Sequence, residues 1–208
     1  MKICKDGTLQ VNAPFRMDIE AVESFILSKY SWFKKRQTEY KKQAQHIKPL
    51  FEEGEKHLYL GEAFTLRLVI SNRSYVEQNK DLLVIYHRKN SSIENILNKW
   101  YKQQALEYFT KRTAIFVNSY NLPEVKKIKV RNMKARWGSC SNRAEITYNI
   151  HLIKATLESI DYVIIHELCH LIHANHGAGF YKLQTKLNPY WKQQKQSINQ
   201  QGIAILKD

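Results

Sequence analysis

Apolar residues recur every three or four positions in several parts of the chain, a spacing that predicts α-helices. The first such stretch, residues 18–46, starts at a capping aspartate, Asp18, and ends before Pro49. Its second part, residues 34–48, is basic and polar, and we expect it to be an exposed helical extension. A longer helix is predicted over residues 93–120, with Ser91 or Ser92 as its cap and Pro123 after it.

Other parts of the chain alternate apolar and polar residues, as β-strands do. Residues 2–12 are expected to form a strand or one arm of a hairpin. Residues 50–90 are expected to form a small antiparallel sheet, with turns at Gly54 and Gly61. Strands are also predicted over residues 128–130 and over 145–153. The chain therefore divides near residue 90, with a strand-rich region at 1–90 and a helix-rich region at 91–208.

The composition is that of an ordinary globular protein, and the charge is not evenly spread. The net charge is +14, and residues 126–143 carry seven lysines or arginines and no acid. Such a stretch favours an anionic or nucleic-acid partner, although it also serves solubility alone.

Membrane insertion and disulfide bonding are not expected. No apolar run approaches the 18–20 or so residues of a membrane helix, and the N-terminus has no signal-peptide core. The three cysteines, Cys4, Cys140 and Cys169, have no CxxC spacing, so we expect a reducing compartment and a cytoplasmic location.

The sequence HELCH at residues 166–170 is an HExxH motif preceded by an apolar run. Residues four apart share one face of a helix, so His166 and His170 are expected to bind one zinc ion. Glu167, next to them, is expected to act as the general base that deprotonates water. We expect this helix to span residues 161–171.

A third metal ligand follows by elimination. After Glu167 the sequence has no other glutamate, so a downstream glutamate ligand is excluded. His173 lies about 10.5 Å further along the axis than His166 if the helix continues, too far to share a zinc ion. His176 lies between Asn175 and Gly177, residues that end helices, and a turn there can bring its ring back toward the ion.

Three segments resemble the YgjP-like family of predicted zinc metallopeptidases, which is similar to SprT-like HExxH proteins. They are RWGSC at 136–140, DYVIIHELCHL at 161–171 and NHGAGF at 175–180. The resemblance implies the same ligands, His166, His170 and His176, with Glu167 as the base. Gly177 stands where serine is commoner, and Tyr181 where tryptophan is commoner.

The expected fold is α+β. A small N-terminal strand-rich region is expected to pack on a C-terminal, minimal zincin-like domain that carries the HExxH active-site helix. Two helical stretches, residues 178–187 and 190–200, are expected to complete this domain around Pro189.

Other residues are candidates for the walls of the cleft. In the loop 136–140, Arg136 is suited to bind a carboxylate or phosphate, and Trp137 to form a wall or to be buried in the structure. The oxyanion donor is left open among four residues that the spacing does not separate. They are Tyr148, Asn149, Tyr181 and Tyr190.

The leading functional hypothesis is a zinc metallopeptidase that acts on a peptide or protein, with the substrate lying along strand 145–153 as a sheet edge. A phosphohydrolase of nucleotides is the first alternative, because of the basic stretch 126–143. A DNA-associated protease or nucleic-acid-binding protein is the second, and no recognition motif for nucleic acid supports it.

Overall fold

The structure is a computed structural model that describes residues 2–3, 9–14, 16–34 and 49–205. It separates into two compact units, residues 1–48 and 49–208. The predicted boundary near residue 90 falls inside the second unit. The reason is that the sheet before residue 90 shares a core with the long helix after it.

The first unit contains a short hairpin and a helix. Strand β1 (Lys2–Ile3) pairs antiparallel with β2 (Leu9–Gln10), so the segment 2–12, predicted as a strand or one arm of a hairpin, contains two short paired strands. Helix α1 (Ile19–Ser28) starts as predicted, and the Asp18 side chain accepts a hydrogen bond from the backbone N–H of Glu20. It ends far before residue 46, because Lys29 leaves helical geometry. Residues 30–34 are helical again, and the rest of the predicted extension over 34–48, residues 35–48, lies outside the described residues.

The second unit begins with a four-stranded sheet. Its strands are β3 (Lys56–Tyr59), β4 (Glu62–Ile70), β5 (Tyr75–Asn79) and β6 (Leu82–His87), in the order β3-β4-β6-β5. Strand β6 lies between β4 and β5 and runs parallel to β4. The prediction of a purely antiparallel sheet was therefore wrong for this one pair.

The glycines that were predicted to mark turns do so. Gly54 and Gly61 both have φ of +84°, a backbone conformation that side chains other than glycine rarely adopt. At Gly61 an added Cβ would also lie only 2.8 Å from the Thr156 Cα. The turn between β3 and β4 therefore depends on glycine both for its backbone angles and for its close approach to the start of the site helix.

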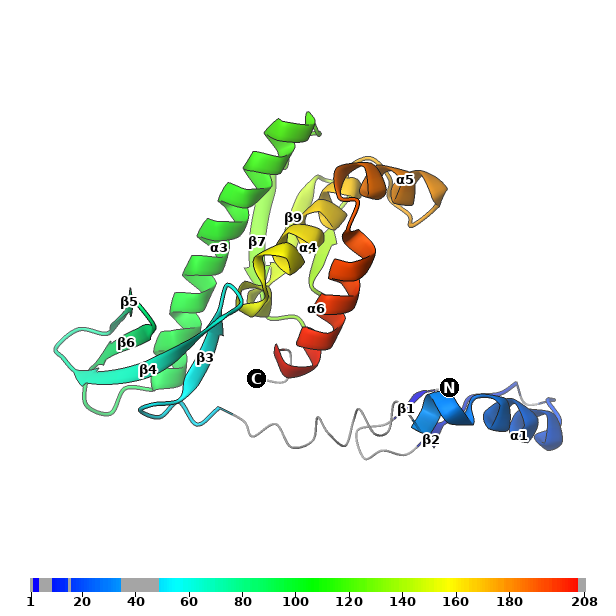
Figure 1. The fold of residues 1–208 in the computed structure, drawn as a ribbon, viewed down its shortest axis with the longest axis horizontal. Coiled ribbons are helices and arrows are strands. Elements are labelled where there is room, and N and C mark those ends of the chain that lie inside the picture. Colours follow the sequence, from blue (N-terminus) through cyan, green and yellow to red (C-terminus); the bar gives the residue numbers. More distant parts are fainter. Residues whose placement is uncertain (1, 4–8, 15, 35–48, 206–208) are drawn as a thin grey trace. The chain divides into compact units, whose positions relative to one another are not determined.

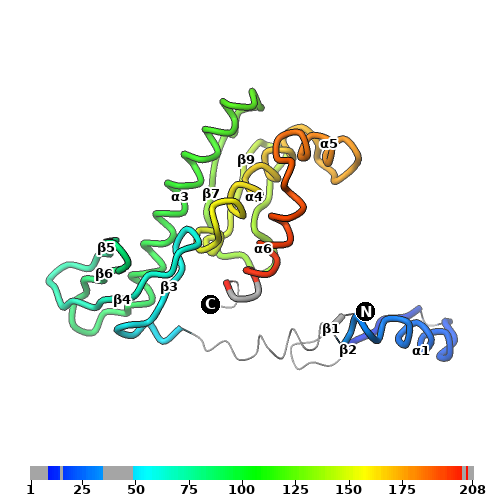
Figure 2. Tube along the Cα trace, in the orientation of Figure 1, coloured from blue at the N-terminus to red at the C-terminus, as the bar shows by residue number. Residues whose placement is uncertain are grey.

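Helix α3 (Ile93–Tyr120) has the predicted bounds, and the Ser92 hydroxyl accepts a hydrogen bond from the backbone N–H of Asn95. Figures 1 and 2 show it running along the second unit, beside the four-stranded sheet at one end and strand β7 at the other. One side of the helix is buried along its whole length and joins the two sheets through a common core. The buried residues of α3 are Leu97, Tyr101, Ala105, Phe109, Thr113 and Phe116.

A three-stranded sheet follows, made of β7 (Lys127–Arg131), β8 (Gly138–Cys140) and β9 (Glu145–Asn149) in the order β7-β9-β8. The predicted strand 145–153 ends at Asn149, whose side chain caps a short 3-10 helix, η1 (Ile150–Lys154), by accepting from the His151 N–H. Because β9 is the central strand, the prediction that it forms the open edge was wrong. The edge strands are β7 and β8, and β8 lies within what was predicted to be a loop.

Three helices close the unit: α4 (Leu157–Cys169), α5 (Ala178–Leu187) and α6 (Trp191–Ile205). Helix α4 begins one turn before the predicted Asp161, and it contacts α3, α5, α6 and β8. Apart from Leu157 at its start, which is 44% exposed, its apolar side chains are fully or almost fully buried, so it lies at the centre of the second unit. In the part of the chain that the structure describes, no helix is long and apolar enough to cross a membrane.

Candidate metal centre

The first two candidate ligands lie at the C-terminal end of α4. His166 is in its last turn and His170 is the C-cap residue, still with right-handed helical angles. Their ring centroids are 5.0 Å apart. The opposite side of the helix carries Ile160, Ile164 and Leu168, which are 0% exposed. The hydrophobic core thus fixes α4 in the rotation that presents both imidazoles to one cleft.

His176 joins them from the turn after α4. The turn is closed by a hydrogen bond from the Gly177 N–H to the Asn175 carbonyl. His176 Nε2 lies 3.0 Å from His166 Nε2, and its ring centroid lies 4.7 Å from that of His170. One ligand atom from each of the three rings lies within 4.8 Å of the others. The structure therefore brings together the three histidines that the sequence selected as ligands.

His173 is not part of this cluster, as the sequence argument expected. Instead, its backbone carbonyl lies 3.0 Å from His170 Nδ1. Its ring packs against Gly179, where an added Cβ would lie 2.9 Å from the ring.

A buried phenylalanine supports all three rings. The Phe180 ring centroid lies 5.0 Å from that of His166 and 4.7 Å from each of the other two, and Phe180 is 0% exposed. It is the third residue of α5, so the start of that helix fixes the spacing of the imidazoles. The sequence analysis gave Phe180 no role, although it closes the NHGAGF segment.

Hydrogen bonds fix the orientation of the two α4 histidines. Gln184 Oε1 lies 3.3 Å from His166 Nδ1, and the His173 carbonyl accepts a hydrogen bond from His170 Nδ1. With Nδ1 of each ring donating, Nε2 is the nitrogen that carries a lone pair into the cleft. Nothing in the sequence pattern singled out Gln184, which is 1% exposed and lies one helical turn after Phe180.

This donor set fits a zinc ion. Two nitrogens bound to one zinc at about 2.0–2.1 Å lie at most about 4 Å apart, close to the spacing seen here. Three imidazole ligands would leave a fourth position open, as in catalytic zinc sites. Burial, followed by the charges of His170 and His176, lowers the pKa of His166 to about 4. Its ring is therefore neutral near pH 7, the form that binds a metal.

Glu167 is the buried acid of the cleft, with 5% of its surface exposed. Its carboxylate packs against Gly138 of β8, where an added Cβ would lie 2.5 Å from Oε1. Burial raises the pKa of Glu167 to about 8, and the nearby Arg136 charge opposes this shift. A carboxyl group with a pKa near neutrality is suited to exchange protons, as a general base and acid must.

The segment 136–140 has both of the roles that the sequence left open. Asn149 Nδ2 donates to the carbonyls of Met133 and Arg136, which fixes the approach to β8. Trp137 packs on α6, where an added Cβ on Gly202 would lie 2.6 Å from its ring. The same segment lines the cleft, so it is a structural support that also forms a wall.

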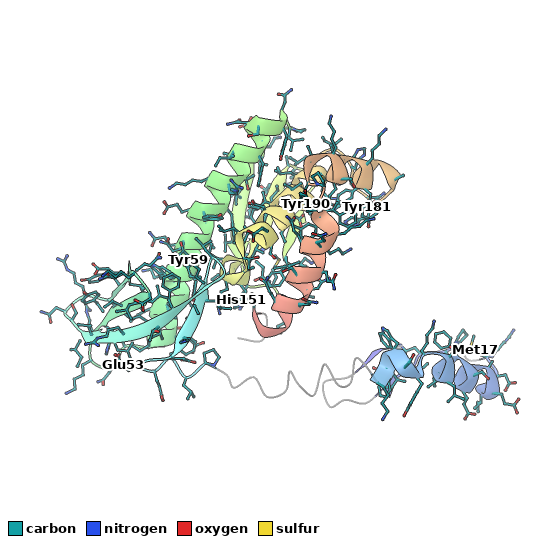
Figure 3. The ribbon with its side chains drawn as sticks, in the orientation of Figure 1. Met17, Glu53, Tyr59, His151, Tyr181 and Tyr190 are labelled. Atoms are coloured by element: carbon teal, nitrogen blue, oxygen red, sulfur yellow. The ribbon has the colours of Figure 1, made fainter. Side chains whose placement is uncertain are left out.

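The cleft has a volume of about 430 Å³ and lies between β8 and α4. None of the four candidate oxyanion donors lines it. Tyr148 is fully buried against Thr113, and Asn149 is used by the loop. Figure 3 shows Tyr181 on α5 and Tyr190 near the start of α6; Tyr181 stacks on Trp191, and Tyr190 is 67% exposed.

Tyr162 lines the cleft instead, one helical turn before His166. Its side chain is mostly buried, and its ring centroid lies 5.9 Å from that of His166. Burial raises the pKa of Tyr162 to about 12, so the hydroxyl stays protonated and can donate. The sequence analysis missed this residue, although its spacing of four from His166 places both on one helix face.

The two described cysteines are not arranged as ligands. Cys169 is 0% exposed in the core. Cys140 lines the cleft, and burial, with the Glu167 charge, raises its thiol pKa to about 11. Both thiols are therefore protonated near neutral pH and are weak metal ligands.

This chain is similar to a family of metallopeptidase domains and to two solved structures of metallopeptidase zymogens. A family model for the YgjP-like metallopeptidase domain matches residues 1–201. The crystal structure of the metallopeptidase zymogen of Pyrococcus abyssi abylysin is similar over 45% of this chain and 93% of its own, with 20% identity and a TM-score of 0.42. That of Methanocaldococcus jannaschii jannalysin, also a metallopeptidase zymogen, is similar over 45% and 95%, with 22% identity and a TM-score of 0.40.

Among curated proteins, none matches the sequence. The family match nevertheless covers almost the whole chain, including the HExxH segment and the NHGAGF segment whose histidines meet in the cleft. This chain therefore belongs to the YgjP-like family of metallopeptidase domains.

Proposed function

We propose that this protein is a zinc-dependent peptidase of zincin-like design, with His166, His170 and His176 as metal ligands and Glu167 as general base. The observation that carries the proposal is the meeting of three imidazoles and one buried carboxylate in a single cleft. A structural histidine cluster would have no need of a buried acid beside it.

A zinc ion held by three imidazoles supplies a Lewis acid that acidifies water and polarises a carbonyl oxygen. The residues of the chain transfer the proton and stabilise the developing charge. Glu167 takes a proton from the attacking water and returns it to the leaving amine nitrogen. Tyr162, which lines the same cleft, has a protonated hydroxyl suited to donate a hydrogen bond to the oxygen on which charge develops.

The substrate in this proposal is an extended peptide that lies along β8. This strand lines the cleft and pairs with β9 on one side only, so its other edge is not paired within the described sheet. Addition of a strand to an open edge binds a peptide through its main chain, largely independent of its sequence. Arg136 adds a positive charge at the wall of the cleft, suited to an acidic side chain or a carboxylate of the substrate.

The test is cleavage of unfolded casein by the purified chain. We expect proteolysis that stops with a chelator and returns with zinc. Glu167→Gln should lower the rate at least a hundredfold, because general-base catalysis contributes about 10²–10⁴. Elemental analysis should still find one zinc per chain in this variant, because Glu167 is not a ligand. His176→Ala is the companion variant and should lose the zinc as well as the activity.

Release of phosphate or pyrophosphate from nucleotides is measured in parallel. Nucleotide hydrolysis that depends on Glu167, with casein left intact, would replace the peptidase proposal with the phosphohydrolase alternative. The charge of the cleft favours the peptidase. Among the described residues that line it, Arg136 is the single lysine or arginine, and one positive charge is too little to balance the several negative charges of a nucleotide polyphosphate.

A further inference from the structure

A second cavity lies in the unit of residues 49–208 and shares no lining residue with the metal cleft. Its volume is about 570 Å³, within the range of small-molecule sites. Its walls come from the start of the four-stranded sheet, α3, the end of β7 and η1. His151, labelled in Figure 3, belongs to η1, which precedes α4, whereas His166 and His170 lie at the far end of that helix and His176 lies in the turn after it.

The walls of this cavity carry a marked excess of positive charge. Four lysines or arginines and two histidines line it, against one carboxylate, Glu94, among the described lining residues. The four cations are Lys99, Lys102, Arg131 and Lys154. They come from three different elements, so folding gathers charges that the sequence spreads over 55 residues. Like charges gathered around a hollow repel one another, and a bound anion relieves that repulsion.

Lys154 is the deepest of these cations. It is 8% exposed, and its Nζ lies 5.3 Å from the centroid of the Tyr101 ring. Lysine is rarely buried to this degree. His151 and His57, which are also buried, line the same cavity, so three buried nitrogen-bearing side chains belong to its wall beside the exposed cations.

The wall that contains His57 is held rigidly. The Glu55 carboxylate accepts hydrogen bonds from the backbone N–H groups of Leu50 and Phe51 and lies 3.2 Å from His57 Nε2. The Phe51 ring packs on the His57 ring with a centroid distance of 5.5 Å. The Tyr101 hydroxyl donates to the Leu58 carbonyl, which fixes the aromatic ring beneath Lys154. A preorganised wall of this kind lowers the entropic cost of binding a ligand.

From this arrangement we infer a binding site for a small ligand that carries phosphate groups, separate from the metal cleft. Phosphate is the anion that matches the set: it offers several oxygens to donors that converge from different directions, and an arginine and lysines are its usual partners in proteins. The volume suits a ligand the size of a pyrophosphate, a tripolyphosphate or a nucleoside diphosphate. The aromatic side chains Phe51 and Tyr101 give the cavity an apolar part beside its cations.

The experiment is calorimetric titration of the full-length chain with sodium pyrophosphate, tripolyphosphate, ADP and adenosine, at 150 mM salt. We expect saturable binding of at least one phosphate compound and none of adenosine. Equal affinities for ADP and pyrophosphate would assign the recognition to phosphate alone, and tighter binding of ADP would add a contact to the base; both results support the site. Because polyphosphates chelate zinc, the titration is repeated on the metal-free chain, where binding should persist.

Two cavity variants and a matched control locate the binding. Lys154→Met keeps the apolar stem and removes the charge, and Arg131→Gln removes a more exposed cation; each should weaken binding at least tenfold. Lys111→Gln makes the same change of charge on α3, nine residues from Lys102 and away from the cavity, and should leave the affinity within twofold. Circular dichroism and the unliganded Tm show which variants are folded. If Lys154→Met is unfolded, the affinity of Arg131→Gln alone tests the location of the site.

Three results would overturn the inference. The first is the absence of binding by every phosphate compound at low millimolar concentration. The second is binding that vanishes when the metal is removed, which would place the ligand at the zinc. The third is an equal loss of affinity in Lys111→Gln and in the cavity variants, which would mean that overall charge attracts the anion and the cavity does not.

Discussion

At the scale of single residues, the position of Glu167, the proposed general base, depends on the absence of a side chain at Gly138 opposite it. Gly138 lies on β8 directly against Glu167, and a Cβ there would overlap with Oε1, Cγ and Cδ of the acid at 2.5–2.8 Å. Contacts under 3.0 Å are not tolerated, so one of the two residues has to move. Backbone atoms of a paired strand move less easily than a carboxylate, so Glu167 is the group that shifts.

Gly138→Ala should therefore lower peptidase activity at least tenfold while the zinc content stays at one per chain. A displacement of about 1 Å in a catalytic group is enough for a loss of this size. The measurement is the rate of casein cleavage, with elemental analysis of the same preparation. Gly177→Ala is the control: this glycine adjoins His176, but its φ is −82° and a Cβ there has no neighbour within 4 Å. Equal losses in both variants would contradict the steric explanation.

Gln184 is a residue whose effect on the metal is indirect. It lies beside His166 Nδ1 in the core and does not line the cleft, so its role is to orient the ring. Partners of this kind usually contribute about 10–100-fold to metal affinity. Gln184→Leu should weaken zinc binding by that factor, measured by competition with a chromophoric chelator.

Gln184→Glu is the variant that separates orientation from packing. It keeps an oxygen acceptor for the His166 N–H, so it should retain most of the zinc affinity that the leucine variant loses. If both variants bind zinc as tightly as the original chain, His166 needs no partner, and the assignment of Gln184 is wrong.

At the scale of elements, the site is precise because α4 is held from several directions. Arg112 on α3 forms two parallel hydrogen bonds to Asp161 on α4, at 2.7 and 2.6 Å. Such a bidentate pair fixes direction as well as distance. On the other side, the segment before β8 carries Trp137 against Gly202 of α6. The cleft therefore lies between elements that are fixed to one another, as a catalytic site requires.

The segment before β3 is a second element held by one acid, and its stability is expected to depend on pH. Partial burial works to raise the pKa of Glu55, but the His57 ring and the N–H groups of Phe51 and Leu50 outweigh it and lower the pKa. A carboxyl group with a lowered pKa in the folded state adds stability above its unfolded pKa, and this stability is lost as the pH falls through the folded value.

Glu55→Gln should therefore reduce the free energy of unfolding by about 1–2 kcal/mol at pH 7, since hydrogen bonds to a charged acceptor are lost. The difference from the original chain should shrink below about pH 4.5, where the carboxylate of the unfolded chain begins to take up a proton. Urea unfolding at a series of pH values measures it. Glu52→Gln, an exposed change in the same segment, should show no such trend. A constant difference at every pH would contradict the assignment.

Elements that are determined by residues close in sequence were predicted well, and elements that depend on contacts between distant residues were not. The long helix 93–120 was correct to the residue, because the serine cap before it and Pro123 after it are local signals. Strand β8 was taken for a loop, because three residues that include a glycine have no pattern of their own and become a strand only by pairing with β9. The order of strands within each sheet is likewise set by contacts distant in sequence. The candidate site was easier to predict from the sequence, since its three histidines lie within eleven consecutive residues.

At the scale of the whole molecule, all the buried residues among those described lie in the unit 49–208. The core runs from Tyr59 to Ile205, and none of the residues of α1 is buried. In the first unit, several large apolar side chains are exposed, among them Ile19 at 73% and Leu27 at 71%. The metal cleft, the second cavity and the residues that hold their walls in place all lie in the second unit.

A chain of residues 49–208 should therefore fold without the first unit and bind one zinc ion. The core that holds α4, the three histidines, Phe180 and Gln184 all lie within it, and a domain of this size buries enough surface to be stable. We expect cooperative thermal unfolding by circular dichroism and a zinc affinity within about threefold of the full chain, since no ligand is removed. His176→Ala in the same fragment is the control and should abolish the stoichiometric zinc. A fragment that is unfolded, or folded without zinc, would show that residues 1–48 stabilise the centre through contacts with the second unit, and the proposal that the site is complete within 49–208 would then be wrong.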